Sequence, residues 1–384
     1  MRGWRARARL ALSCVPVYEF FSALYQARHQ PRSTDAHCIV STHYFLPSTL
    51  FSLPNGRSAE LPCGRAHARH PRTPLYLLPS SPYFSLLPML LSFGSINVDV
   101  TLKVKKIVRP GETISSSGLA VHGGGKGANQ SVALARAGAK VFHAGQVGED
   151  TRWMRDLLEK SGVDVSLVLV SSEIPGGQAF IQVDENGQNA IIVHGGANQA
   201  IPSELISRAL SLTHPGDWLL LQNEINLTPE LIRAGHDAGL VVCLNPAPMT
   251  PEVAKEWPLE LVDILIVNEI EGMELAGLPV NSFPETILET LASRYPKTQI
   301  CLTLGSKGSI YKAPGSETYF QGAFSVDAVD TTGAGDTFTG FLLAEMMRGS
   351  DPQTAMRIAA RAAALAVSRH GAIESIPNLC DLGI

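Results

Sequence analysis

The chain has 384 residues, of which 45% are hydrophobic and 17% charged, and its formal net charge is −4. This composition excludes an intrinsically disordered chain and suits one large α/β domain or two ordinary ones. A mildly acidic chain argues against nucleic acid as its main partner. Six cysteines without a Cys-x-x-Cys pair argue against a zinc site or a disulfide framework.

Residues 1–88 form a leader that differs from the rest of the chain. The leader contains ten arginines, no lysine and only three acidic residues, and it shows no sustained hydrophobic period. Such a composition is typical of organelle transit peptides, and a gene-model artefact with the true start near Met89 is the other interpretation. We therefore expect a folded domain over residues 89–384. We expect a cytoplasmic protein, with a nuclear pool as an alternative, or an organellar one if the leader is a targeting signal.

The first predicted core strand covers residues 90–96 and leads into Asn97 and Asp99. Alternate residues of an extended chain point to the same side, and open α/β sheets bind ligands beyond the carboxyl ends of their strands. An amide and a carboxylate in this position can bind sugar hydroxyls. An ordinary turn after a strand is the alternative.

Four short β-like runs lie outside the main strand pattern. They cover residues 101–104, 114–121, 180–183 and 190–193. Asn186-Gly187, between the last two runs, is a strong hairpin signal. Because the runs are too short for a main sheet, we expect a separate small β-sheet that covers the site as a lid, with segments at about residues 100–122 and 178–196.

A glycine-rich segment from Gly123 to Gln130 precedes a predicted helix over residues 131–137. It does not match the phosphate-binding P-loop, because Gly127 follows Lys126 where that pattern needs Ser or Thr. Its glycines instead allow the backbone to approach a ligand closely, and Lys126 and Asn129 can donate to hydroxyls. A glycine-rich loop that caps a helix is the alternative.

From residue 139 onward, near-continuous apolar strands alternate with helices, which predicts a parallel sheet covered on both faces. Strands are predicted at residues 141–145, 218–222, 241–244, 264–267 and 300–304, and helices at 152–160, 229–238 and 351–367. Polar residues such as Glu224 and Asn245 repeatedly follow the strand ends, where this fold class places its site.

Asn268 and Glu271 follow their strand directly and lie three residues apart, which puts them on one face if a helix begins there. Their oxygens suit Mg²⁺, which contacts protein sparsely, and a solvated helix start is the alternative. The loop Gly305-Ser306-Lys307-Gly308 has little side-chain bulk and suits a nucleotide.

The segment from Asp330 to Asp336 reads Asp-Thr-Thr-Gly-Ala-Gly-Asp and precedes a predicted helix. Gly333, Ala334 and Gly335 leave bare backbone N–H groups at the helix N-terminus, where the dipole favours an anion. Asp336 stands at the mouth of this anion hole, where a carboxylate can take a proton from a hydroxyl that attacks a phosphate. A helix N-cap is the alternative.

The order of these motifs over about residues 90–377 resembles the ribokinase/PfkB family of carbohydrate kinases. The resemblance implies a three-layer α/β/α fold with a mostly parallel central sheet and a β lid that often forms the contact of a homodimer. It implies ATP-dependent phosphorylation of D-ribose at its 5-hydroxyl, which gives D-ribose 5-phosphate and ADP. Another sugar or nucleoside, such as deoxyribose, fructose or adenosine, is the alternative substrate, and a non-catalytic sugar-binding regulator is a weaker alternative.

The resemblance also implies roles for individual residues. Asp336 would be the catalytic base, and the backbone of Gly333, Ala334 and Gly335 would stabilise the transferring phosphoryl group. The implied ribose-binding residues are Asn97, Asp99, Gly125, Lys126, Asn129, Glu224 and Asp336. The implied ATP-binding residues are Asn268, Thr303, Leu304, Gly305, Ser306, Lys307, Gly308, Gly335 and Asp336. Glu271 would organise Mg²⁺, and the implied K⁺ residues are Asp330, Thr332, Ala366, Arg369, Gly371 and Ser375.

Overall fold

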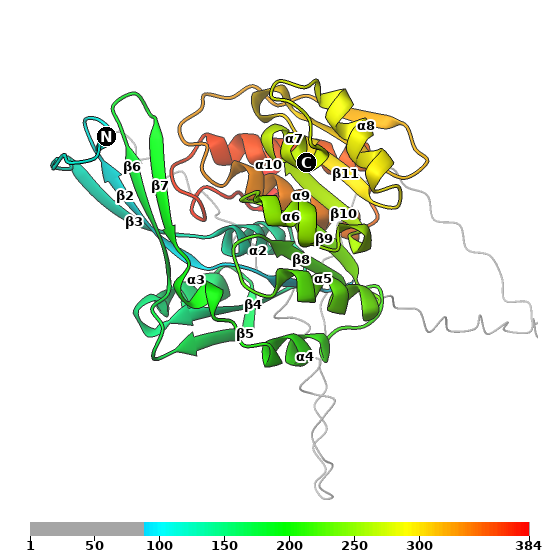
Figure 1. Ribbon diagram of the computed structural model, residues 1–384, viewed down its shortest axis with the longest axis horizontal. Coiled ribbons are helices and arrows are strands. Elements are labelled where there is room, and N and C mark those ends of the chain that lie inside the picture. The colour runs from blue at the N-terminus through cyan, green and yellow to red at the C-terminus, as the bar shows by residue number, and fades with distance from the viewer. Residues whose placement is uncertain (1–87, 384) are drawn as a thin grey trace, which may run out of the picture. The chain divides into compact units, whose positions relative to one another are not determined.

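The computed structural model describes residues 88–383, so the predicted leader lies outside the described part of the chain except for its last residue. The described residues form a large sheet with helices on both sides and a second, smaller sheet (Figure 1). Among these residues, none of the helices has the length and apolar character that a membrane crossing requires.

In the described part of the chain, the large sheet has nine strands in the order β13-β12-β11-β10-β9-β8-β1-β4-β5. Their bounds are β1 Leu90–Phe93, β4 Val141–Gly148, β5 Asp164–Ser171, β8 Trp218–Gln222, β9 Val241–Asn245, β10 Ile264–Asn268, β11 Gln299–Thr303, β12 Ser309–Lys312 and β13 Thr318–Gln321. The strands from β11 to β5 in this order pair in parallel, and β12 and β13 add an antiparallel edge. The carboxyl ends of the parallel strands therefore lie along one edge of the sheet.

Helices cover both faces of the large sheet. They are α2 Lys126–Arg136, α3 Trp153–Lys160, α4 Glu204–Leu210, α5 Thr228–Asp237, α6 Pro251–Glu256, α7 Glu269–Ala276, α8 Pro284–Arg294, α9 Ala334–Met347 and α10 Pro352–Val367. Because successive strand residues point to opposite sides, Leu90 and Leu220 pack against α2, α9 and α10, whereas Leu91 and Leu221 pack against α4, α5, α7 and α8. The predicted three-layer α/β/α fold class is confirmed.

The small sheet has the order β3-β2-β6-β7. Its strands are β2 Asn97–Lys103, β3 Gly118–Gly124, β6 Gly177–Val183 and β7 Asn189–His194. Residues that pair across the strands share a face, and one such row consists of Val121, Val100, Phe180 and Ile192. This row is apolar and largely exposed. Asp99 is the next residue to Val100 along β2, so it lies on the opposite face.

Three details of the predicted elements were wrong. The first core strand ends at Phe93 rather than at residue 96, and Asn97 and Asp99 belong to β2 of the small sheet. Helix α2 begins at Lys126 rather than at residue 131, because Gly125 takes a left-handed φ of 92° as its N-cap. The remaining elements without a sequence prediction are β5, β12, β13, α4, α6 and α8.

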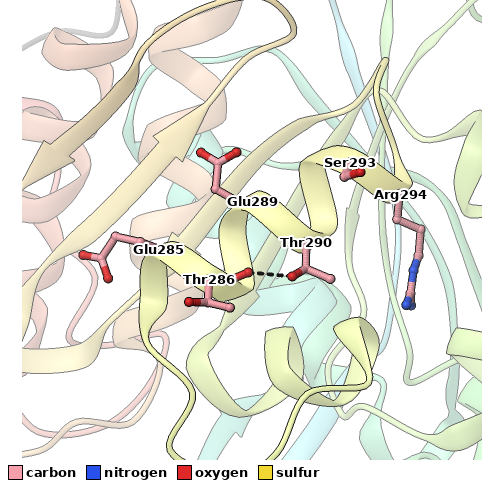
Figure 2. A pocket seen from close by; sticks show the side chains of 6 residues that line it. All are labelled: Glu285, Thr286, Glu289, Thr290, Ser293 and Arg294. Atoms are coloured by element: carbon pink, nitrogen blue, oxygen red, sulfur yellow. Dashed lines mark hydrogen bonds between the residues drawn. The ribbon is translucent and has the colours of Figure 1, made fainter.

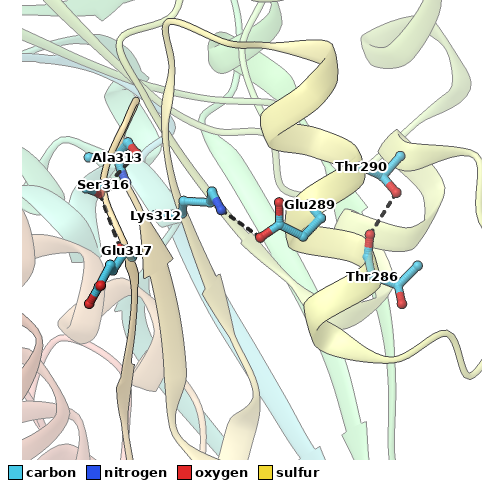
Figure 3. Close-up of polar contacts among 7 residues, drawn as sticks. All are labelled: Thr286, Glu289, Thr290, Lys312, Ala313, Ser316 and Glu317. Carbon is cyan, nitrogen blue, oxygen red and sulfur yellow. Dashed lines mark hydrogen bonds and ion pairs between the residues drawn. The ribbon is translucent and has the colours of Figure 1, made fainter.

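The antiparallel edge is tied to the rest of the domain by polar contacts (Figure 3). Lys312 Nζ of β12 lies 2.6 Å from Glu289 Oε1 of α8. The β12–β13 turn is closed by Ser316, whose hydroxyl donates to the Ala313 carbonyl at 3.0 Å. These contacts hold the sheet edge beyond β11, whose carboxyl end carries part of the candidate site.

Candidate active site

Asp336 lies in the first turn of α9, next to the helix N-terminus. The N-cap, Gly333, takes a left-handed φ of 74°, which glycine adopts without side-chain strain. Asp336 is 8% exposed, and a Cβ added at Gly335 would meet no atom within 4 Å. The helix thus presents N–H groups and a carboxylate side by side, with room for an anion at the helix end.

Two amide side chains of α2 hold the carboxylate of Asp336. Asn129 Nδ2 donates to Oδ2 at 2.8 Å, and Gln130 Nε2 donates to Oδ1 at 2.9 Å. Because a carboxylate oxygen can accept two hydrogen bonds, each oxygen of Asp336 keeps a lone pair for another donor. The predicted sugar residue Asn129 and the predicted base are therefore in direct contact.

Lys126 begins α2 and lies among four carboxyl groups. These belong to Asp336, Glu224, Glu271 and Asp99. Burial by itself would lower the pKa of Lys126, but the carboxyl groups outweigh burial and raise the pKa. Lys126 is therefore positively charged. Its charge interacts with residues predicted to bind the sugar, with the predicted catalytic base and with the residue predicted to organise Mg²⁺. The structure brings these three groups of residues into one cluster of polar side chains around Lys126.

Asp99 lies on β2 against the backbone of β3. A Cβ added at Gly124 would stand 2.1 Å from Asp99 Oδ2, so glycine leaves the room that this carboxyl group occupies. Burial raises the pKa of Asp99 to about 7, and the charges of Glu224 and Asp336 add to the effect. Near neutral pH this carboxyl group is present in both protonation states, so it can donate to or accept from a sugar hydroxyl.

Glu224 follows β8 and joins two segments of the cleft. Its Oε2 accepts hydrogen bonds from the Ser95 hydroxyl at 2.5 Å and from the Lys126 N–H at 3.1 Å. Burial raises the pKa of Glu224, against the opposing effect of Lys126. The carboxyl group thus connects the N-terminus of α2 to the link between β1 and β2.

Asn97 is oriented by Asn198, which lies in the short 3₁₀ helix η2 (Gly196–Gln199). Asn198 Nδ2 donates to Asn97 Oδ1 at 2.7 Å, and Asn198 Oδ1 accepts from the Ile96 N–H at 2.9 Å. Because the Ile96 N–H can only donate, it must face Asn198 Oδ1. Asn198 therefore turns its NH₂ group toward Asn97. Asn97 therefore keeps its own Nδ2 for a ligand.

The predicted ATP-binding residues lie at the ends of the neighbouring strands β10 and β11. Asn268 ends β10 and pairs in register with Thr303, which ends β11. Lys307 Nζ lies 3.3 Å from Glu269 Oε1, so an exposed ion pair links the two loops. Leu304 differs from its neighbours, because its side chain packs into the core and only its backbone can face a nucleotide. The exposed glycine and serine of this loop are Gly305 and Ser306.

Glu271 serves as a helix cap and also belongs to the cluster of polar side chains around Lys126. The Asn268 N–H donates to Glu271 Oε2, and the Glu271 N–H donates to Asn268 Oδ1, both at 2.9 Å. Burial raises the pKa of Glu271, which also interacts with the charges of Lys126 and Asp336. Within residues 88–383 no group of three or more His, Cys, Asp or Glu side chains could hold a metal ion. A lone carboxylate fits Mg²⁺, which keeps several waters.

The residues predicted for K⁺ lie around the C-terminal end of α10. Asp330 accepts from the Thr332 N–H at 2.9 Å and from the Gly371 N–H at 3.0 Å. Burial would raise the pKa of Asp330, but these hydrogen bonds keep it below its ordinary value. The Asp330 N–H donates to the Val367 carbonyl at 3.1 Å, which holds the loop against the helix end. The other residues of this set, in or just beyond the end of α10, are Ala366, Arg369 and Ser375.

A surface hollow lies along α8 (Figure 2). Its described lining consists of Glu285, Thr286, Glu289, Thr290, Ser293 and Arg294. The Thr290 hydroxyl donates to the Thr286 carbonyl at 2.7 Å, and Arg294 donates to the Ala276 carbonyl at 3.1 Å. These contacts stabilise α8 and its junction with α7, and none of the predicted site residues lines the hollow.

Sequence reasoning gave no role to three polar residues that support the site: Gln130, Gln222 and Asn198. Gln130 directly follows the predicted Asn129, and Gln222 ends its strand as Asn245 does, so the strand-end rule that pointed to Asn245 could also have found Gln222. Asn198 gave no such signal, because its role depends on how η2 packs against Ile96 and Asn97.

The model of the pfkB family carbohydrate kinases matches residues 87–379 of this chain. A ribokinase from Haemophilus influenzae is 33% identical over 291 residues, which is 74% of this chain and 94% of that protein. A deoxyribokinase from Salmonella typhi is 32% identical over 293 residues, with the same coverage of both proteins. The structure of Arabidopsis thaliana ribokinase complexed with ribose and ATP has a TM-score of 0.69 and 32% identity, and the match covers 77% of this chain and 98% of that chain.

Proposed function

Because this chain belongs to the pfkB family of carbohydrate kinases, we propose that it transfers the γ-phosphoryl group of ATP to the 5-hydroxyl of D-ribose, giving D-ribose 5-phosphate and ADP. One observation carries this proposal. The carboxylate of Asp336 lies beside the N-terminus of α9, accepts a hydrogen bond from Asn129 and belongs to the cluster of side chains that also contains Asp99 and Lys126.

The polar groups around Asp99 suit a pentose. Asn97 presents an amide donor, Asp99 and Glu224 present carboxyl groups, and Asn129 has a buried Oδ1 without a protein partner. A sugar hydroxyl both donates and accepts, so this mixed set can fix several hydroxyls at once. The sugar then places its primary hydroxyl against Asp336, and positioning of this kind accounts for much of the rate of a kinase.

Asp336 takes the proton of the 5-hydroxyl as the oxygen attacks the γ-phosphorus, and the bond from the γ-phosphorus to the β,γ-bridging oxygen breaks. The bare N–H groups at residues 333–335 and the cationic Lys126 stabilise the charge on the transferring group. ATP lies against the loop that follows β11, with Asn268 on the neighbouring strand.

Two cations are part of the proposal. Glu271, through water, would hold Mg²⁺, which neutralises charge on the β- and γ-phosphate oxygens. The loops at residues 330–332 and 366–375 would hold K⁺ through backbone and side-chain oxygens, and the support is their contact through Asp330, Gly371 and Val367. Bound K⁺ would keep these loops, and hence the anion hole next to Asp330, in place.

Asp336→Asn tests the central step. The variant keeps the shape and the contact with Asn129 but cannot take a proton, so we expect kcat to fall by about 10²–10⁴-fold, the usual contribution of a general base. Ribose binding should stay measurable by calorimetry. Asp237→Asn, at an exposed position near the end of α5, is the matched control and should keep the wild-type rate. An Asp336→Asn enzyme with a near-normal kcat would exclude the base role.

Deoxyribose is the second candidate substrate, since a deoxyribokinase is about as similar to this chain as the ribokinases are. The two sugars differ only in the 2-hydroxyl. A coupled ADP-release assay across ribose, deoxyribose, fructose and adenosine decides between them, and we expect the highest kcat/KM with ribose. A protein that binds these sugars and transfers no phosphoryl group would instead be a sugar-binding regulator.

We also propose that the protein is a homodimer through the small sheet. The support is the exposed apolar row on the face opposite Asp99, in which Val121 is 53%, Phe180 40% and Ile192 67% exposed. Exposed apolar side chains in a contiguous row are typical of protein contacts. In such a dimer each small sheet is braced by its partner while its other face covers the sugar.

The predicted compartment, cytoplasmic unless the leader directs the protein elsewhere, stays a proposal. Intact mass and N-terminal sequencing of the native protein test it, because a chain that begins near Met89 would lack the arginine-rich segment.

A further inference from the structure

Gln130 is fully buried in the first turns of α2 and uses both ends of its amide. Its Nε2 donates to Asp336 Oδ1 at 2.9 Å and to Asn245 Oδ1 at 3.0 Å. Its Oε1 accepts from Gln222 Nε2 at 2.8 Å. All the hydrogen-bonding capacity of the Nε2 group therefore points at two oxygens, one of them on the proposed base.

The direction of these hydrogen bonds is set by the backbone of the large sheet. Asn245 Nδ2 donates to the Ile266 carbonyl of β10 at 2.9 Å. A carbonyl can only accept, so Asn245 must turn its Oδ1 toward Gln130, and Gln130 must turn its Nε2 toward Asn245 and Asp336. A flipped Gln130 amide would place its oxygen against two oxygens and its NH₂ group against the donor of Gln222.

Gln130 differs in position from Asn129, the other amide on Asp336. Asn129 also has an oxygen without a protein partner, which suits a sugar hydroxyl. The Gln130 amide makes its polar contacts with Asp336, Asn245 and Gln222, and the fully buried side chain exposes no group to a substrate.

We propose that Gln130 is a positioning residue for phosphoryl transfer. Its amide is held through Asn245 to the backbone of β10 and by the hydrogen bond from Gln222. In this position Gln130 orients the Asp336 carboxylate so that a free lone pair faces the attacking hydroxyl. This inference rests on the proposed kinase function.

Gln130→Glu is the first test, since it keeps the shape and replaces the donor by a second carboxyl group next to Asp336. Two carboxyl groups this close share one proton, because the two negative charges would repel each other. We expect a kcat about 10–100-fold lower at neutral pH, the range seen when a supporting hydrogen bond is lost. We also expect the acidic limb of the kcat profile to move to higher pH by about one unit or more, with partial recovery of kcat as the pH rises. KM for ribose should change less than about 3-fold, because the sugar is not touched.

Gln130→Met is the second variant, with a similar shape and no donor. We expect a comparable fall in kcat without the recovery at high pH, because no new carboxyl group titrates. If Gln130→Glu does not fold, Gln130→Met alone decides. A kcat lower by about 10-fold or more, with ribose affinity kept in calorimetry, supports the proposal, and a wild-type kcat overturns it.

Gln353→Glu provides the matched control, with the same charge change at an exposed position of α10, and should leave the pH profile unchanged. Two results would overturn the inference. The first is a Gln130→Glu enzyme that keeps the wild-type kcat and the wild-type acidic limb of the pH profile. The second is that both Gln130 variants lose ribose affinity and melting temperature to the same extent while kcat is preserved. Failure of the proposed function would look different, since the wild-type protein would then phosphorylate no sugar or nucleoside of the panel.

Discussion

The acidic residues of the candidate site differ in their charge state because their neighbours differ. Asp330 accepts two backbone N–H groups and has a lowered pKa, whereas Asp99 is buried among other carboxyl groups and has a pKa of about 7. The ordinary pKa of Asp99 is 3.8. A buried carboxyl group of this kind is costly to the fold and therefore points to a use in binding.

Asp99→Asn should separate stability from binding. Between about pH 4 and 7 the unfolded chain has lost the Asp99 proton and the native protein has kept it, so this group lowers stability as the pH rises through that window, and its full cost is present above about pH 7. The variant should therefore melt higher than the wild type at about pH 8, with no gain at about pH 4, and should lose most of its ribose affinity. A melting difference that does not depend on pH would contradict this account.

Asn198→Asp tests the orientation of Asn97. The aspartate would place an oxygen against Asn97 Oδ1, where the native amide donates at 2.7 Å, and a buried oxygen pair without a donor costs about 1–3 kcal/mol. We expect Asn97 to turn its amide toward residue 198 and offer its oxygen to the sugar. The ribose KM should then rise with little change in the KM for ATP. Steady-state kinetics with each substrate varied will show whether the loss is confined to the sugar.

At the level of elements, the N-terminus of α9 depends on two glycines for different reasons. Gly333 has a left-handed φ of 74°, whereas Gly335 lies within the helix with open space beside it. The first glycine is needed for the backbone conformation. The second is needed to keep the space in front of the N–H groups free for a phosphoryl group.

The variants Gly333→Ala and Gly335→Ala should therefore act in opposite directions on stability. Gly333→Ala should lower the free energy of unfolding by about 1–2 kcal/mol, which is the cost of holding an L-residue in the left-handed conformation. Gly335→Ala should raise the free energy of unfolding by about 0.5–1 kcal/mol, since alanine favours a helix more than glycine does. Its methyl group should also block the anion hole and lower kcat by about 100-fold. Thermal melting and kcat are measured on both. An active, more stable Gly335→Ala enzyme would show that the phosphoryl group binds elsewhere.

At the level of the whole molecule, the small sheet is the part of the described domain with two different faces. One face carries Asn97 and Asp99, and the other carries the exposed apolar row. The parallel strands of the large sheet, by contrast, are buried on both faces by helices. An antiparallel sheet with an uncovered apolar face needs a second surface to shield it.

Charges placed on this face, in the apolar row and at Leu119 beside it, should separate a dimer. We expect Leu119→Asp combined with Ile192→Asp to give a monomer in analytical ultracentrifugation, because both side chains are about two-thirds exposed, at 66% and 67%, and would be desolvated in the contact. Val280→Asp, at an 81% exposed position outside the small sheet, is the control and should keep the wild-type mass. The dimer proposal fails if the double variant has the same mass as the wild type.

The sequence by itself determined the fold class and most strands, because hydrophobic periodicity and glycine positions are local properties. The run at residues 218–222 became β8, and the segment Asp330 to Asp336 became the entry to α9. Edge strands such as β12 and β13 escaped prediction, since strands of four residues carry too little pattern.

Only the tertiary structure decided which polar groups meet. Gln130 and Asp336 are 206 residues apart, and Asn97 and Asn198 are 101 apart, so no local pattern links them. The pKa of Asp99 likewise depends on Glu224 and Asp336, which reach it from other elements. Hydrogen bonding and desolvation depend on distances between groups, and packing of β2, α2 and α9 around one cleft sets those distances.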